Sequence, residues 1–150
     1  MTNIFKANDV AALVTRINKL TPETTPLWGK MSVSQMLAHV NVSYELAYDN
    51  KHNKPGPIMK WILKTFVKEA VVGPKPYKKG SPTAKAFLIT GDRNFDQEKA
   101  RLIDYLHKTQ QLGEQHFNGK ESHSFGALSS SEWNVMFAKH LEHHLAQFGV

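Results

Sequence analysis

The chain of 150 residues contains no cysteine. This absence excludes disulfide bonds, thiolate metal ligands and cysteine nucleophiles, and nothing indicates an oxidising compartment. The apolar runs are far shorter than the roughly 20 residues that cross a bilayer. The amino-terminal residues also lack the basic start and apolar stretch of a signal peptide. We therefore expect a soluble, cytoplasmic protein without a membrane partner.

Arginine is scarce and occurs only at positions 16, 93 and 101, although the net charge is +6. Lysine carries the excess, because segment 51–85 contains nine lysines and Glu69 as its one acidic residue. Such a segment predicts either an anion-attracting loop or a solvated surface. Since arginine is the preferred reader of phosphates and bases, the solvated surface is favoured and a nucleic-acid partner is disfavoured.

The composition is that of an ordinary globular protein, with 41% hydrophobic and 21% charged residues. A chain of this length can bury a core without cross-links, so we expect one domain covering residues 1–150.

Helical periodicity appears in four segments. The second and fourth begin with serines that form capping-box patterns, Ser32 with Gln35 and Ser129 with Glu132. Their apolar residues recur at helical spacing, which predicts amphipathic helices. The four predicted helices cover residues 8–20, 32–49, 94–112 and 129–148.

A long insertion separates the second and third predicted helices. Its first part, 58–72, predicts a short amphipathic helix that uses Trp61, Ile62, Phe66 and Val67 as its apolar face. Glycine and proline then predict an irregular stretch, and 86–90 is the one candidate strand. The predicted fold is therefore all-α, a four-helix bundle with a long irregular insertion, and loop 73–90 is expected to shape substrate choice.

The last predicted helix carries His140, His143 and His144. At about 100° per residue, His140 and His144 fall on or beside its apolar face, whereas His143 turns roughly 80° toward the flank. Two imidazoles four residues apart can bind one metal ion, which would provide a partner for one nitrogen of each ring. The alternative is a pair of buried, hydrogen-bonded histidines.

Known zinc-protease helices do not match this pattern. Their motifs require glutamate at position 141 or 143, where this chain has leucine and histidine. A third ligand must come from another helix, and His39 in the second helix is the natural candidate. His123 is expected near the rim of the site, while His52, His107 and His116 are expected at the surface.

Two motifs resemble the DinB/YfiT-like superfamily, whose members are regarded as metalloenzymes. The first is the carboxy-terminal run from Phe125-Gly126 through Glu132-Trp133 to His140, His143, His144 and Phe148-Gly149. The second is Trp28-Gly29-Lys30-Met31-Ser32 leading to His39. The resemblance implies that His39, His140 and His144 coordinate a divalent ion, nickel or zinc, and that the protein is a homodimer.

The resemblance also implies a metal-dependent enzyme that acts on a small molecule, such as a transferase using a low-molecular-weight thiol. Tyr44, Glu45 and His143 are the candidate proton acceptors. The alternative function is a non-catalytic bundle that binds a polyanion, such as nucleic acid, through its lysine-rich insertion.

Overall fold

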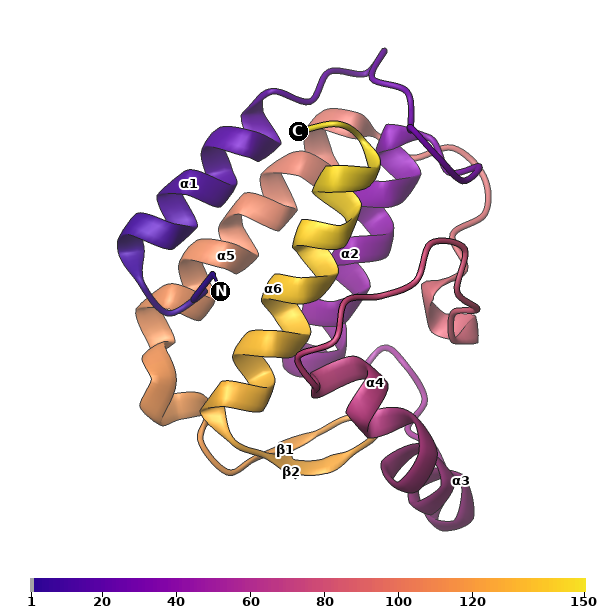
Figure 1. The fold of residues 1–150 in the computed structure, drawn as a ribbon, viewed down its shortest axis with the longest axis vertical. Coiled ribbons are helices and arrows are strands. Elements are labelled where there is room, and N and C mark those ends of the chain that lie inside the picture. Colours follow the sequence, from indigo (N-terminus) through magenta and orange to yellow (C-terminus); the bar gives the residue numbers. More distant parts are fainter. Residues whose placement is uncertain (1) are drawn as a thin grey trace.

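The computed structural model describes residues 2–150 and is mainly α-helical, as predicted. Its longer helices lie side by side in Figure 1. Helix α2 packs against α5 and α6, and α5 also packs against α1. Within residues 2–150, no helix has both the length and the apolar character that a membrane crossing requires. The longer helices are α1 (Ala7–Asn18), α2 (Val33–Tyr48), α5 (Phe95–Phe117) and α6 (Ser130–Gln147).

Both predicted capping boxes are present. The Ser32 hydroxyl accepts a hydrogen bond from the Gln35 amide at 3.2 Å, and the Gln35 side chain accepts one from the Ser32 amide at 3.0 Å. Ser129 and Glu132 repeat this exchange at the start of α6. These bonds satisfy amides that the first helical turn leaves free. They thereby define where α2 and α6 begin, and with it the direction of each later side chain.

The first part of the insertion is helical, as predicted. It consists of α3 (Pro57–Ile62), a π-helical turn η1 (Leu63–Val67) and α4 (Lys68–Val72). The predicted apolar face is correct only at Val67, which packs against the core together with Leu63, a residue that was not predicted. Trp61 and Phe66 are 62% and 72% exposed. Since this segment lies outside the longer helices (Figure 1), only one of its sides is covered.

Residues 73–84 contain neither helix nor strand, in agreement with the prediction. The strand predicted at 86–90 is wrong. Lys85–Phe87 forms a 3-10 turn, η2, and the amides of Phe87 and Leu88 bond to the carbonyls of Ala84 and Lys85. These amides are therefore used within the turn and not in a strand ladder.

Helix α5 continues five residues beyond its predicted end and bends at Gly113, whose φ of 73° suits glycine. An unpredicted antiparallel hairpin follows, formed by β1 (Lys120–Ser122) and β2 (Gly126–Leu128). The Ser122 hydroxyl donates to the Gly126 carbonyl at 2.7 Å and accepts from the Phe125 amide at 2.9 Å. This side chain closes the turn, so a polar segment forms a hairpin without an alternating apolar pattern.

Stacked aromatic rings form the centre of the core. The ring of Tyr44 lies between those of Phe137 and Tyr105, with centroids 4.5 Å and 5.3 Å away. Trp133 stacks on Phe137 at 5.5 Å. Such aromatic pairs fix the spacing of α2, α5 and α6, from which the functional side chains project.

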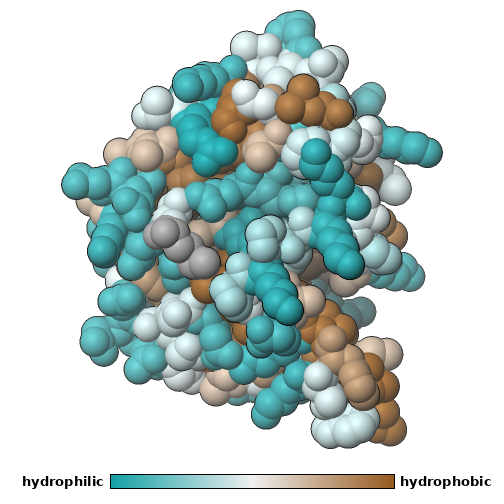
Figure 2. Space-filling model, viewed as in Figure 1, coloured by the Kyte–Doolittle hydropathy of each residue, from teal (hydrophilic) through white to brown (hydrophobic). Residues whose placement is uncertain are grey.

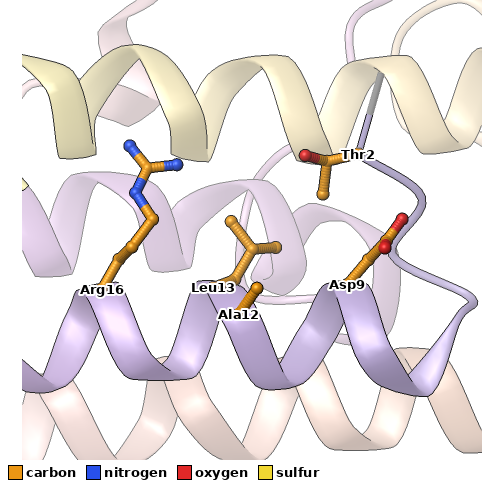
Figure 3. A pocket seen from close by; sticks show the side chains of 5 residues that line it. All are labelled: Thr2, Asp9, Ala12, Leu13 and Arg16. Carbon is orange, nitrogen blue, oxygen red and sulfur yellow. The ribbon is translucent and has the colours of Figure 1, made fainter.

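Both ends of the described chain are attached to neighbouring helices. Asn134 accepts a hydrogen bond from the Ile4 amide at 2.8 Å, and Arg16 donates to the Val150 carbonyl at 2.7 Å. Figure 3 shows Arg16 and Asp9 at opposite ends of a small hollow between α1 and its neighbours. This hollow of about 210 Å³ is lined by no histidine.

The irregular stretch after α4 is held by one side chain. Lys139 of α6 donates to the carbonyls of Ala70, Gly73 and Lys75 at 2.9, 2.6 and 3.2 Å. Its ammonium group also lies 4.6 Å from the centre of the Tyr77 ring. A lysine that binds the last carbonyls of a helix in this way stabilises its end.

We expect Lys139→Met to loosen residues 70–77 without unfolding the helices, because the change removes these bonds but keeps the side-chain length. Amide hydrogen exchange measured by mass spectrometry should become roughly tenfold faster there, the size expected for loss of charge-assisted bonds. Lys6→Met removes an exposed lysine without such bonds and should leave the exchange unchanged. Equal exchange rates in Lys139→Met and the unaltered protein would show that Lys139 does not hold residues 70–77.

Candidate metal centre

Three histidines from two helices converge between α2 and α6. His39 comes from α2, and His140 and His144 come from successive turns of α6. Each offers a ring nitrogen, and these three nitrogens lie within 4.8 Å of one another. The Nε2 atoms of His39 and His140 are 3.0 Å apart. The structure thus brings together the three residues singled out from the sequence.

Each imidazole is oriented by a hydrogen bond at its other nitrogen. Nδ1 of His39 lies 2.8 Å from the Phe87 carbonyl, and Nδ1 of His144 lies 2.7 Å from Oε1 of Gln147. Because these oxygens only accept, both Nδ1 atoms carry the proton and both Nε2 atoms keep a lone pair, which in His39 can accept a hydrogen bond from Nε2 of His140. Nδ1 of His140 pairs with the Ser43 hydroxyl at 2.7 Å. The arrangement leaves one nitrogen of each ring near the other two rings.

The environment keeps the three rings neutral. His39 and His144 are 5% and 7% exposed, and His140 is partly exposed as a residue. Burial, reinforced by the neighbouring imidazoles, lowers the pKa of His144 to about 3 and holds the pKa of His140 well below its usual value. Burial also lowers the pKa of His39. A neutral imidazole is the form that binds a metal ion.

Gln147 connects this cluster to the Trp28-Gly29 motif. Its amide nitrogen donates to the Trp28 carbonyl at 2.7 Å, while its oxygen accepts from His144. Gly29 has a φ of 84°, and a Cβ atom there would lie 2.6 Å from that amide nitrogen. Glycine is therefore required both by the backbone and by the close approach of Gln147.

Aromatic side chains surround the cluster. The Phe87 ring lies 5.3 Å from that of His39 and 5.5 Å from that of His140. Tyr77 of the loop lies 5.7 Å from His143, whose ring is 5.9 Å from that of Trp28. The part of the insertion predicted to shape the site therefore contacts it through Tyr77 and Phe87.

His143 lies beside the cluster and not within it, as its helical phase predicts. Its ring centre is 5.1 Å from that of His144. Burial, with the nearby charge of Lys79, lowers its pKa. This side chain is a neutral imidazole next to the three converging nitrogens.

The other two candidate proton acceptors lie elsewhere. Tyr44 is fully enclosed in the aromatic core, and burial raises its pKa. Glu45 pairs with Lys51, His52 and Arg101 in a groove of about 560 Å³. Ala86 and Leu88 line this groove, whereas Phe87 between them faces the histidines.

The remaining histidines take no part in the cluster. His107 and His116 are exposed, as predicted. His52 is half-buried in its pair with Glu45. His123, expected at the rim, bonds instead to Ser124 and lies 3.4 Å from the His52 carbonyl, beyond the end of α2.

Three groups that orient the imidazoles were not predicted from the sequence: Ser43, Gln147 and the Phe87 carbonyl. Ser43 lies four residues after His39, and Gln147 lies three after His144, so helical spacing could have identified both. The Phe87 carbonyl belongs to an irregular segment, and no side-chain pattern could have identified it.

The donor set is of the kind that binds a metal ion, although its three nitrogens, which lie within 4.8 Å of one another, must move closer to share one ion, because two nitrogens about 2.1 Å from an ion are at most about 4.2 Å apart. Two nitrogens bound to one ion at about 2.1 Å lie roughly 3.0 Å apart when the angle between the bonds is 90°. The Nε2 atoms of His39 and His140 have this separation. Among residues 2–150, the hydrogen bond of His144 is made by Nδ1, so its Nε2 is available to bind an ion. Three neutral imidazoles also leave coordination positions open, which is typical of a catalytic site.

Comparison with curated proteins and with solved structures gives no match to this chain. One family matches residues 3–149, and its description is "Protein of unknown function (DUF1569)". The match includes all three converging histidines and both motifs around them. The chain therefore belongs to the DUF1569 family.

Proposed function

We propose that His39, His140 and His144 hold a divalent metal ion, zinc or nickel, and that the protein is a metal-dependent enzyme acting on a small molecule. The observation that carries this proposal is that the two nitrogens of each imidazole have different surroundings. One nitrogen is bonded to the surrounding protein, and the other faces the two neighbouring histidines. Metal-binding histidines have this second hydrogen bond in nearly all known sites.

Such an ion would supply Lewis-acid chemistry and lower the pKa of a bound water or thiol. The protein's own groups would position and deprotonate the substrate. His143 is neutral and adjacent to His144, so it is the group placed to accept a proton. Trp28, Tyr77 and Phe87 would contact apolar parts of the substrate and exclude water from the site.

We further propose that the chain is one domain and that its fold is a four-helix bundle of the DinB-like type. The protein would then be a metalloenzyme. A low-molecular-weight thiol as co-substrate, a homodimer and a cytoplasmic location stay predictions of the sequence. The nucleic-acid alternative has less support. Two of the lysines on which it depends, Lys60 and Lys68, pair with Glu121 and Glu132.

Metal content tests the site directly. In protein purified without an affinity tag and loaded with zinc or nickel, we expect about one ion per chain by elemental analysis. His39→Ala, His140→Ala and His144→Ala should each lose most of it, because two imidazoles bind a divalent ion far more weakly than three. His143→Ala is the matched control on the same helix and should retain the ion.

Two results would contradict the assignment of His39, His140 and His144 as metal ligands. One is a protein that takes up no transition metal at all, which would leave the histidines as packed core residues. The other is loss of metal in His143→Ala alone.

Gln147→Leu tests the orienting bond to His144. We expect roughly a 10- to 100-fold loss of zinc affinity, since removal of such a bond at other sites has effects of this size. Competition with a chromophoric chelator measures the change. Affinity equal to that of the unaltered protein would show that Gln147 does not position His144.

A pair of glycine variants provides the control. Gly29→Ala and Gly113→Ala both strain a left-handed backbone, but only a Cβ at position 29 meets Gln147. Gly29→Ala should therefore weaken zinc binding, while Gly113→Ala should lower stability alone.

The lowered histidine pKa values predict a weak pH dependence of metal binding. Three imidazoles with an ordinary pKa near 6.5 would lose roughly 30-fold in affinity between pH 7 and pH 6, because protons compete for each nitrogen. With pKa values lowered by burial, protons compete only at lower pH, and the loss should be only a few-fold. Chelator competition at both pH values, corrected for the chelator's own protonation, distinguishes the two results.

A further inference from the structure

The outer side of α3 and η1 exposes large apolar side chains. Ile58, Trp61 and Phe66 are 79%, 62% and 72% exposed, and Met59 and Ile62 are 51% and 37% exposed. We refer to these five residues as the α3 patch. In Figure 2 a hydrophobic lobe projects at the lower right, where Figure 1 places α3. A projecting group of apolar side chains of this kind marks an interaction surface.

The opposite side of the same segment is fixed to the protein. Leu63 and Val67 pack against the core. Lys60 pairs with Glu121 of the hairpin at 2.6 Å, and Lys68 pairs with Glu132 of α6 at 2.7 Å. The α3 patch is therefore presented as one face of an anchored helix, and a partner can approach it only from outside.

The surroundings of the α3 patch are basic. Lys54 and Lys64 are exposed near it, and their charges, with that of Lys60, act on Glu121, so this region carries three lysines against one glutamate. A second copy of the chain would bring two such basic rims together. An anionic surface complements them instead, and lysines beside a membrane contribute attraction to anionic lipids.

We propose that the α3 patch inserts into the surface of an anionic lipid bilayer, with α3 and η1 lying in the plane of the headgroups. Aromatic and aliphatic side chains on one face, with lysines at its edges, are the composition of helices that lie at membrane interfaces. A flat surface also suits a helix whose other side is covered, whereas a protein groove encloses more of a helix. The sequence predicted no membrane partner, and this proposal departs from that prediction; the absence of a crossing helix within residues 2–150 does not oppose it, because surface insertion requires none.

Co-sedimentation with vesicles tests this proposal. The protein as purified should bind vesicles of phosphatidylcholine and phosphatidylserine at 7:3, and bind pure phosphatidylcholine at least tenfold more weakly. Raising the salt from 50 to 300 mM should weaken binding to the anionic vesicles several-fold, because salt screens the lysines. Trp61→Ser/Phe66→Ser should lower the partition coefficient by roughly tenfold or more, since both side chains lose their contact with the acyl region.

Two variants serve as controls. Leu27→Ser/Leu88→Ser removes two apolar side chains that are 71% and 61% exposed outside the α3 patch, and should bind within about twofold of the unaltered protein. Trp61→Phe should keep binding but lose most of the fluorescence quenching by brominated acyl chains, which reports insertion of this tryptophan. Circular dichroism should show the same melting curve for all variants, because the altered residues are exposed.

Several results would overturn the proposal. One is equal vesicle binding by the two double variants, and another is no binding to anionic vesicles at low salt. A dimer that Trp61→Ser/Phe66→Ser converts to monomers, without vesicle binding, would assign the patch to self-association. Metal content does not enter these outcomes, so the fate of the metal proposal is separate.

Discussion

The arrangement of the protein depends on one constraint: a buried imidazole needs a partner at each ring nitrogen. Three imidazoles lie together here, and the protein supplies an oxygen to the outer nitrogen of each. The inner nitrogens face one another. Nε2 of His39 and Nε2 of His140 can share a hydrogen bond at 3.0 Å, which leaves His144 with an inner nitrogen that a cation bound to all three rings would satisfy. The constraint therefore links a local packing problem to the proposed metal function.

The partners of the buried imidazoles come from segments that are far apart in the sequence. Gln147 must reach both His144 and the Trp28 carbonyl, so the chain passes close to it at Gly29. The Phe87 carbonyl must point at His39, and its segment forms a short turn in place of a strand. Lys139, adjacent to His140, holds the end of α4 and the start of the loop. The insertion lacks regular secondary structure where its carbonyls accept hydrogen bonds from side chains of α2 and α6, because those carbonyls are then not used in a helix or a sheet.

Local chemistry made much of this predictable. Helix starts followed from Ser32 and Ser129, because a capping box depends only on residues three apart. The distinction between His144 and His143 followed from helical phase. The prediction for 86–90 was wrong because apolar composition alone does not show whether a strand partner exists. The hairpin at 120–128 was missed because its turn is closed by Ser122 and not by an apolar pattern. The outward face of α3 depends on what packs beside it, and sequence periodicity does not contain that information.

The lysine-rich segment shows why charge alone leaves the partner open. A lysine-rich segment attracts both the phosphates of a nucleic acid and the anionic headgroups of a bilayer. The side chains between the lysines bear on which partner to propose. A nucleic-acid surface would present the charges outward, yet Lys60 and Lys68 turn to Glu121 and Glu132, and Trp61 and Phe66 occupy the outward positions. Apolar groups gain nothing from contact with a phosphate backbone, but they gain free energy on entering acyl chains. The orientation of α3, more than its charge, therefore favours a lipid surface.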